Sequence, residues 1–218
     1  MSQKPLLVIV GAGPGVAAGV AGKFGSEGFR IVLVARTERT LNGGLEELRG
    51  RNVEAYGETA DAADPDSLVR AFERIRAQYG DADVLVYNVA NIVRGNALEL
   101  SEEQLLQDLR GNAVGALTSA KQVVPAMIGR KSGALFFTGG TISLRPNPEY
   151  ASLSIGKAAI RSLALSLAET LSPHGIYVGQ VLIGGHVRKG TYYDPDRIAE
   201  VFWDLYVRKD RQEAVYQQ

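Results

Sequence analysis

The sequence contains no cysteine and only two histidines among its 218 residues. Without cysteine there is no disulfide framework, no thiolate metal site and no cysteine nucleophile, and two histidines disfavour a histidine-rich metal centre. We therefore predict no metal site. An excess of charge of one sign is also lacking, because 24 Lys and Arg residues balance 24 Asp and Glu residues. This balance argues against nucleic acid or an anionic membrane as a partner.

Long hydrophobic runs are missing as well. The first apolar stretch, Leu6–Val10, has five residues, too few for the core of a signal peptide or for a membrane span. The simplest interpretation is a cytoplasmic protein. Apolar residues make up 45% of the chain and 25 residues are glycine, so a sizeable core and close backbone approaches are expected. We expect residues 1–218 to form a single domain.

Short apolar, β-branched runs recur along the chain and alternate with segments of helical pattern. Because most of these runs are continuous rather than alternating, they predict strands that are covered on both faces. The β-α-β-α order predicts an α/β fold, a doubly wound parallel sheet of about seven strands with helices on both faces. The runs are Leu6–Val10, Arg30–Val34, Val53–Tyr56, Val84–Tyr87, Ala134–Thr138, Ile176–Leu182 and, as the last, Ala214–Tyr216.

Several predicted helices carry start signals. Asp64 and Asp194 each precede a proline, which is the pattern of an N-cap followed by a first-turn proline. The longest helical candidate opens with a capping box at Ser101 and runs to about Gly129. Pro125 near its end predicts a bend or fraying there.

A glycine-rich segment follows the first predicted strand. Gly11, Gly13 and Gly15 lie between that strand and a run of small residues where a helix should begin. Glycines at this point permit a tight turn and allow a diphosphate to approach the backbone N–H groups of the helix N-terminus. The pattern predicts a dinucleotide site. From these residues alone, methyl-donor cofactors and flavin nucleotides stay open as alternatives.

The residue after the second predicted strand discriminates between the two nicotinamide dinucleotides. Arg36 stands where an acidic residue would bind the ribose hydroxyls of NAD, and its guanidinium suits the 2′-phosphate of NADP. Glu38, two residues later, is a contrary sign. We predict NADP as the cofactor and NAD as the less favoured alternative.

Together these segments resemble the short-chain dehydrogenase/reductase family from Leu6 to about Tyr216. The stretch from Val10 to Ala17 is similar to the family's Thr-Gly-x-x-x-Gly-x-Gly, with Val10 and Ala17 replacing its first and last members. The resemblance implies a Rossmann-type fold and the oxidation or reduction of an alcohol or carbonyl with a nicotinamide cofactor. It also implies further cofactor contacts at Val16, Asp61, Ala62, Asn88, Val89, Ala90, Lys157 and Ile183.

The family's active-site motif is incomplete in this sequence. Family members carry Tyr-x-x-x-Lys on one helix, and Lys157 matches the lysine, but Leu153 stands at the tyrosine position. Gly140 stands where a carbonyl-polarising serine is expected after the fifth strand. Asn112 matches the asparagine of the fourth family helix. The resemblance thus implies catalytic roles for Asn112 and Lys157 and leaves the proton donor open.

Three candidates for that donor are Tyr150, His186 and a water molecule. Tyr150 is seven positions before Lys157, an offset of about 10.5 Å along a helix, so a regular helix would keep it from the usual position. Pro148 can distort the helix entrance, and we take Tyr150 as a candidate catalytic acid beside the alternative that it packs at the helix start. His186 lies where family members approach the nicotinamide.

Two functions are compatible with this pattern. The first is an NADP-dependent oxidoreductase that acts on a small-molecule carbonyl or alcohol, and the second is a non-catalytic protein that keeps the fold and the nucleotide pocket. The resemblance also implies a homodimer or homotetramer. We expect the small-residue run Gly111–Ala120 to allow close helix packing at such an interface, and Arg188–Tyr193 to form a short substrate lid.

Overall fold

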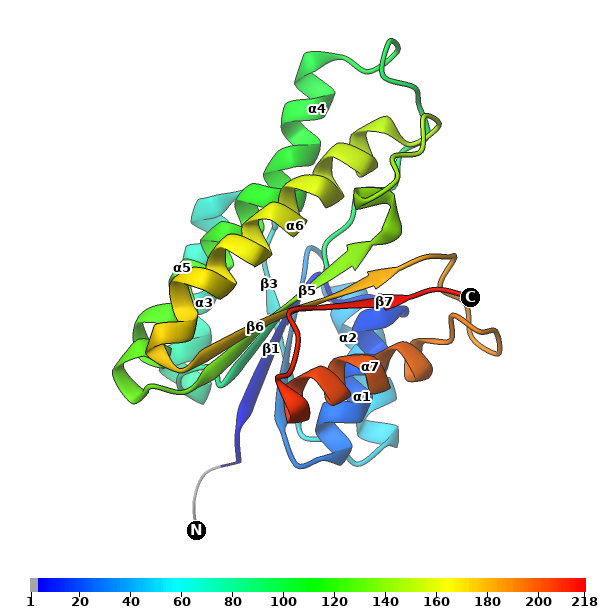
Figure 1. Cartoon of the computed structure of the whole chain (residues 1–218). Coiled ribbons are helices and arrows are strands. Elements are labelled where there is room, and N and C mark those ends of the chain that lie inside the picture. Colours follow the sequence, from blue (N-terminus) through cyan, green and yellow to red (C-terminus); the bar gives the residue numbers. More distant parts are fainter. Residues whose placement is uncertain (1–3) are drawn as a thin grey trace.

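A computed structural model describes residues 4–218, and residues 1–3 of the predicted domain lie outside the described part. Its centre is a seven-stranded, all-parallel sheet in the order β3-β2-β1-β4-β5-β6-β7 (Figure 1). The strands are β1 (Leu6–Val10), β2 (Arg30–Ala35), β3 (Ala55–Thr59), β4 (Val84–Tyr87), β5 (Gly133–Gly140), β6 (Ile176–Ile183) and β7 (Glu213–Tyr216). The predicted doubly wound α/β fold is confirmed.

Helices cover both faces of the sheet, as the continuous apolar runs predict. Helices α3, α5 and α6 contribute to one apolar cluster, and α1, α2 and α7 contribute to the other. Helix α4 extends beyond the sheet, beside the first turns of α6 (Figure 1). The helices are α1 (Val16–Ser26), α2 (Glu38–Gly50), α3 (Pro65–Tyr79), α4 (Glu102–Leu109), α5 (Gly115–Arg130), α6 (Ala151–Leu171) and α7 (Pro195–Arg208).

The third strand begins later than the apolar run Val53–Tyr56 predicts. Asn52 adopts a positive φ of 56°, and the N–H of Val53 donates to the carbonyl of Leu48 at 3.0 Å. Val53 therefore closes the end of α2 instead of entering the sheet. Its buried side chain packs in the same apolar cluster as α1 and α2. A run of apolar residues does not distinguish a helix-closing contact from the first residue of a strand.

The long helix predicted over 101–129 is divided. Helix α4 ends at Leu109, a π-helical turn covers Arg110–Val114, and α5 continues to Arg130. Pro125 lies inside α5 on an exposed face, and the helix continues past it, so the expected end is correct while fraying at the proline is not seen. The irregularity is instead at the π-turn, a feature that frequently marks functional sites.

Three of the small residues of 111–120, namely Gly115, Ala116 and Ala120, pack inside the chain. A Cβ at Gly115 would lie 2.2 Å from the carbonyl oxygen of Ala62, and Ala116 and Ala120 are buried in the core of this chain. Their small size is thus explained by the close approach of α5 to the sheet. The small size of these residues is therefore not evidence for contact with another subunit.

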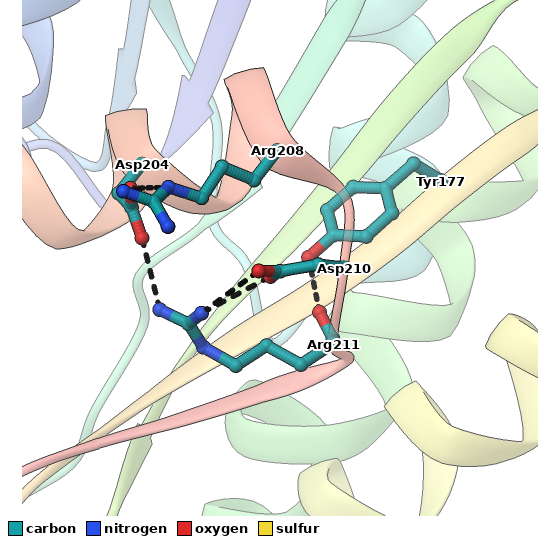
Figure 2. Close-up of polar contacts among 5 residues, drawn as sticks. All are labelled: Tyr177, Asp204, Arg208, Asp210 and Arg211. Atoms are coloured by element: carbon teal, nitrogen blue, oxygen red, sulfur yellow. Dashed lines mark hydrogen bonds and ion pairs between the residues drawn. The ribbon is translucent and has the colours of Figure 1, made fainter.

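Charged pairs tie the end of α7 to the start of β7 (Figure 2). Asp204 accepts hydrogen bonds from Arg208 at 2.6 Å and from Arg211 at 2.9 Å, and Arg211 also pairs with Asp210 at 3.0 Å. The hydroxyl of Tyr177 donates to the carbonyl of Arg211 at 2.6 Å. This cluster lies at the amino edge of the sheet, opposite the carboxyl edge where parallel α/β sheets place their binding sites.

Candidate functional site

Two cavities lie side by side along the carboxyl edge of the sheet. The first, of about 390 Å³, contains Arg36 in its wall and is called the Arg36 cavity. The second, of about 620 Å³, contains Lys157 and is called the Lys157 cavity. Asn88 and Ala90, which follow β4, line both cavities. Because they share these two residues, the two cavities adjoin at the end of β4.

Most of the residues singled out from the sequence line one of these cavities. Those of the Arg36 cavity are Gly11, Arg36, Asp61, Ala62, Asn88, Val89 and Ala90. Those of the Lys157 cavity are Gly15, Val16, Asn88, Ala90, Tyr150, Leu153, Lys157, Ile183 and His186. Gly13 and Asn112 line neither. Gly13 faces a third cavity of about 350 Å³ between α1 and α2, and Asn112 is buried beneath α6.

The glycine loop has the geometry of an anion cradle. Gly11 has a φ of 89°, and a Cβ there would lie 2.9 Å from the backbone of Asn88 and Val89, so this position needs glycine. At Gly13 a Cβ would meet nothing within 4 Å, which leaves space beside the loop. Helix α1 follows with no acidic residue in its first turn and no side-chain cap. Its first N–H groups are therefore suited to a phosphate.

The walls of the Arg36 cavity are held by local hydrogen bonds. The side-chain amide of Asn88 donates to the carbonyl of Gly11 at 3.0 Å, which joins the loop after β4 to the glycine loop. Asp61 accepts from the N–H of Ala63 at 2.9 Å and so fixes the turn after β3. Arg36 is exposed and forms no hydrogen bond or ion pair within residues 4–218. Glu38, which weakened the sequence-based prediction of NADP, does not line this cavity.

Lys157 is a buried cation in the wall of the Lys157 cavity, and its acceptor Val89 lines the Arg36 cavity. The lysine side chain projects from α6, and the residue is 5% exposed. The ammonium group donates to the carbonyl oxygens of Thr138 at 2.7 Å and Val89 at 3.3 Å. Burial lowers the pKa of Lys157 to about 8, because desolvation disfavours the charged form. The two carbonyls hold this ammonium at the ends of β4 and β5.

Asn112 lies in the π-turn behind Lys157. A Cβ at Gly156 would be 2.6 Å from the amide nitrogen of Asn112, so glycine at 156 lets α6 approach this side chain. Neither amide atom of Asn112 finds a hydrogen-bond partner within the described residues, and the buried hydroxyl of Thr138 has none either. Buried polar atoms without partners are costly, and these can bind a further polar group.

The positions for a proton donor differ from the usual family arrangement. Leu153 lines the Lys157 cavity but carries no hydroxyl, and a Cβ at Gly140 would have its nearest neighbour at 3.4 Å. Tyr150 is the N-cap residue of α6, with φ −134° and ψ 52°, and lies outside the helix. Only the N-cap position separates Tyr150 from the helix, so most of the expected spacing of about 10.5 Å along the axis from Lys157 remains. Tyr150 and the exposed His186 both line this cavity.

The expected lid, Arg188–Tyr193, does not itself line the Lys157 cavity, although His186 and Val187 just before it do. Tyr192 stacks on Tyr216 of β7 with ring centroids 4.8 Å apart. The hydroxyl of Tyr216 donates to the carbonyl of Tyr192 at 2.8 Å. The segment is thus attached to β7.

Sequence reasoning missed a buried carboxylate at the far end of the site. Asp108 at the end of α4 is 2% exposed and accepts hydrogen bonds from the side chains of Asn91, Gln104 and Ser152. It therefore joins α4 to the loop after β4 and to the first turn of α6. An aspartate within a polar helix carries no sequence signal for this role.

Comparisons with known proteins agree with the geometry. The profile of the short chain dehydrogenase family matches residues 5–188. The chain is 28% identical over 202 residues to a 3-oxoacyl-(acyl-carrier-protein) reductase of Staphylococcus aureus, covering 92% of this chain and 82% of that protein. No helix within residues 4–218 is long and apolar enough to cross a membrane.

Solved structures of short-chain oxidoreductases and ketoreductases are also similar to this chain. A metagenomic short-chain oxidoreductase in complex with NADP has a TM-score of 0.88 at 26% identity, covering 97% of this chain and 96% of that one. An actinorhodin polyketide ketoreductase variant with NADPH has a TM-score of 0.91 at 25% identity, covering 99% and 97%.

Proposed function

The chain belongs to the short-chain dehydrogenase family, and within this family we propose that it is an NADP-dependent oxidoreductase that acts on a carbonyl compound or its alcohol. One observation carries the proposal: a buried lysine lies near the boundary of a cavity that contains Arg36 and a largely apolar one. Asn88 and Ala90 line both cavities, and the ammonium of Lys157 is held at their junction by the carbonyls of Thr138 and Val89.

The Arg36 cavity fits the nucleotide part of NADP. We assign the diphosphate to the glycine loop and the first turn of α1, and the 2′-phosphate to Arg36, which has no competing partner among residues 4–218. Asp61 and Ala62 form the wall assigned to the adenine. Lys157 is assigned to the ribose hydroxyls at the junction. When bound there, the cofactor supplies or accepts a hydride.

Reduction of a carbonyl also requires a proton at the oxygen, and that proton must come from this chain or from solvent. Tyr150 supplies the phenol that lines the Lys157 cavity, and we propose it as the donor. Its O–H bond breaks as the new O–H bond of the alcohol forms. The Lys157 ammonium stabilises the negative charge left on the phenol oxygen. The unpartnered amide of Asn112 is proposed to bind a polar group behind Lys157.

Two measurements test this proposal in sequence. Fluorescence titration with NADPH and NADH measures binding, and the loss of NADPH absorbance with a panel of aldehydes and ketones measures turnover. We expect NADPH to bind more tightly and turnover to be slow. Tyr150→Phe should lower the remaining rate without changing NADPH affinity. Tight NADPH binding with no turnover for any carbonyl would instead identify the non-catalytic alternative.

The assembly and compartment are further parts of the proposal. We propose a homodimer or homotetramer, for which the support is the family and the exposed apolar side chains of Leu106 on α4, Val114 in the π-turn and Ile155 on α6. Light scattering at micromolar concentration would contradict it by giving the 23.4 kDa mass of one chain. A cytoplasmic location stays a prediction from composition.

A further inference from the structure

The charged side chains that line the Lys157 cavity are all of one sign. Arg145 and Lys157 are the charged side chains in its wall, and no Asp or Glu of the described residues lines it. The Arg36 cavity, in contrast, has Asp61 and Asp108 beside its arginine. A substrate in the Lys157 cavity thus meets two cationic groups with no carboxylate beside them.

Arg145 is held in place by its backbone while its side chain is without a partner in the described part of the chain. Its N–H donates to the carbonyl of Thr141 at 3.0 Å, at the end of the 3₁₀ turn Thr141–Ser143. Two residues later the loop is tied to α6, because the N–H of Asn147 donates to the hydroxyl of Ser154 at 3.1 Å. The guanidinium itself has no hydrogen bond or ion pair with any residue of 4–218. The loop therefore presents an unpaired cation at the cavity.

The acidic residue of the same loop, Glu149, pairs with an arginine other than Arg145. Glu149 forms an ion pair with Arg94 at 2.5 Å, on the side of the loop that lines a different, smaller cavity. Glu149 therefore does not pair with Arg145, and the guanidinium of Arg145 can bind the anionic group of a ligand. A guanidinium binds a carboxylate through two parallel hydrogen bonds, which gives direction as well as charge.

The remaining wall of the cavity is mostly aliphatic. Its apolar side chains include Ile92, Ile142, Leu153, Ile183 and Val187. An apolar body would replace water along this wall, and an anionic end would meet Arg145. The carbonyl between them would lie toward Lys157 and Tyr150. We infer that the substrate is an oxo acid, an apolar carbonyl compound that carries a carboxylate recognised by Arg145.

This inference rests on the proposed oxidoreductase function, and its test separates the two. Benzoylformate, 4-phenyl-2-oxobutanoate and 2-oxohexanoate are compared with their methyl esters, which keep the body and the carbonyl but lack the charge. Binding to the protein saturated with NADP⁺ is measured by calorimetry. No hydride is available in this complex, so affinity is measured without turnover. Reduction of the same compounds with NADPH is measured separately.

We expect at least one acid to bind about tenfold more tightly than its ester, and Arg145→Gln to remove that preference. Arg145→Lys should retain part of it. Arg49→Gln is the matched control, because Arg49 is exposed on α2 and lines none of the four cavities described. NADPH affinity should be the same in all four proteins.

Three results would overturn the inference: equal binding of acid and ester in the unmodified protein, no binding of any acid, or an Arg145→Gln variant that loses NADPH affinity. The last would assign Arg145 to the cofactor. If Arg145→Gln does not fold, the comparison of acid with ester in the unmodified protein still decides. A preference for acids without their reduction would support recognition of a carboxylate by Arg145 and contradict the proposed reduction of these compounds.

Discussion

The two cavities at the carboxyl edge of the sheet differ in how much of the family pattern each one keeps. The Arg36 cavity has Gly11 and Ala12 of the glycine loop and an arginine without a partner among residues 4–218, while Gly15 and Val16 at the start of α1 line the Lys157 cavity. The Lys157 cavity keeps the lysine but has Leu153 and Gly140 where two hydroxyls are expected. The atoms proposed for nucleotide binding and those proposed for proton transfer are therefore different, and the two can be tested separately.

The difference has a physical origin. Binding a dinucleotide depends mostly on backbone shape and on many N–H groups, so single side-chain changes alter it little. Proton transfer depends on one hydroxyl at one distance, and a positioned donor typically contributes about 10²–10⁴-fold to the rate. A site can thus keep its cofactor while its chemistry becomes slow.

The largest expected effect comes from restoring both hydroxyls. Leu153→Tyr places a phenol one helical turn from Lys157. Gly140→Ser adds a hydroxyl that can donate to the substrate carbonyl, at a position where an added Cβ has its nearest neighbour at 3.4 Å. We expect the double variant to reduce carbonyl compounds about 10²-fold faster than the unmodified protein, as measured by NADPH oxidation.

The matched control is Leu153→Phe with Gly140→Ala, which adds similar volume without either hydroxyl. This pair should show no gain. If the unmodified protein is already fast and loses its activity with Tyr150→Phe, the donor has moved fully to Tyr150. Position 153 would then not be a vacant catalytic position.

The second effect is a pH dependence of the unfolding free energy that arises from Lys157. Desolvation lowers the pKa of this lysine from its ordinary value of 10.5, which holds for the unfolded chain, to about 8 in the folded one. Between these pH values the unfolded chain binds more protons, so the free energy of unfolding rises with pH from about 8 to 10.5, by up to about 3 kcal/mol. Urea denaturation across this range, without cofactor, measures the rise.

Lys157→Met keeps a long apolar side chain and has no titratable group. The difference in unfolding free energy between the two proteins should therefore depend on pH in this window, and other titrating groups cancel in the comparison. A difference that is independent of pH between about 8 and 10.5 would mean that the ammonium is not desolvated in the folded chain.

The third effect concerns cofactor choice in the Arg36 cavity. Arg36→Ala removes the guanidinium assigned to the 2′-phosphate, so the preference for NADPH over NADH should fall about tenfold in a fluorescence titration. Arg39→Ala is the control, because Arg39 lines the cavity between α1 and α2 and not the Arg36 cavity. Equal affinity for NADPH and NADH in the unmodified protein would contradict the assignment.

The smallest effect is expected at the opposite edge of the sheet. Asp204→Asn weakens the ion pairs with Arg208 and Arg211, which are partly exposed (Figure 2). We expect the unfolding free energy to fall by about 1 kcal/mol or less, with NADPH affinity unchanged. A change in cofactor affinity would show that the two edges are coupled.

Much of the fold was predictable because its signals are local. Each strand but β3 coincides closely with an apolar run, and the capping signals at Asp64, Ser101 and Asp194 mark helix starts that the structure confirms. The π-turn at Arg110–Val114 was not predicted, because a π-turn and an α-helix carry the same side-chain pattern over five residues. Val53 was misplaced for a similar reason.

Site residues were predicted from the sequence where they belong to a motif with a fixed position relative to a strand or helix. The glycine loop, Arg36 and Lys157 carry positional patterns, and the structure brings most of them to the two adjoining cavities. Asp108 and Arg145 carry none, because their positions depend on packing between segments far apart in the chain. Helical spacing argued against Tyr150 although it was kept as a candidate, and the tertiary structure shows that it lines the Lys157 cavity from the N-cap of α6.

The sequence by itself determined the parallel sheet and the glycine loop, and it placed Leu153 and Gly140 at the two positions where hydroxyls were expected, since each depends on residue identity and on neighbours a few positions away. Tertiary structure alone decided the burial of Lys157 between the ends of β4 and β5, the partners of Asp108 and the position of Arg145 beside an aliphatic wall. The physical reason is that desolvation and charge pairing depend on which distant segments meet, and local sequence patterns do not encode those contacts.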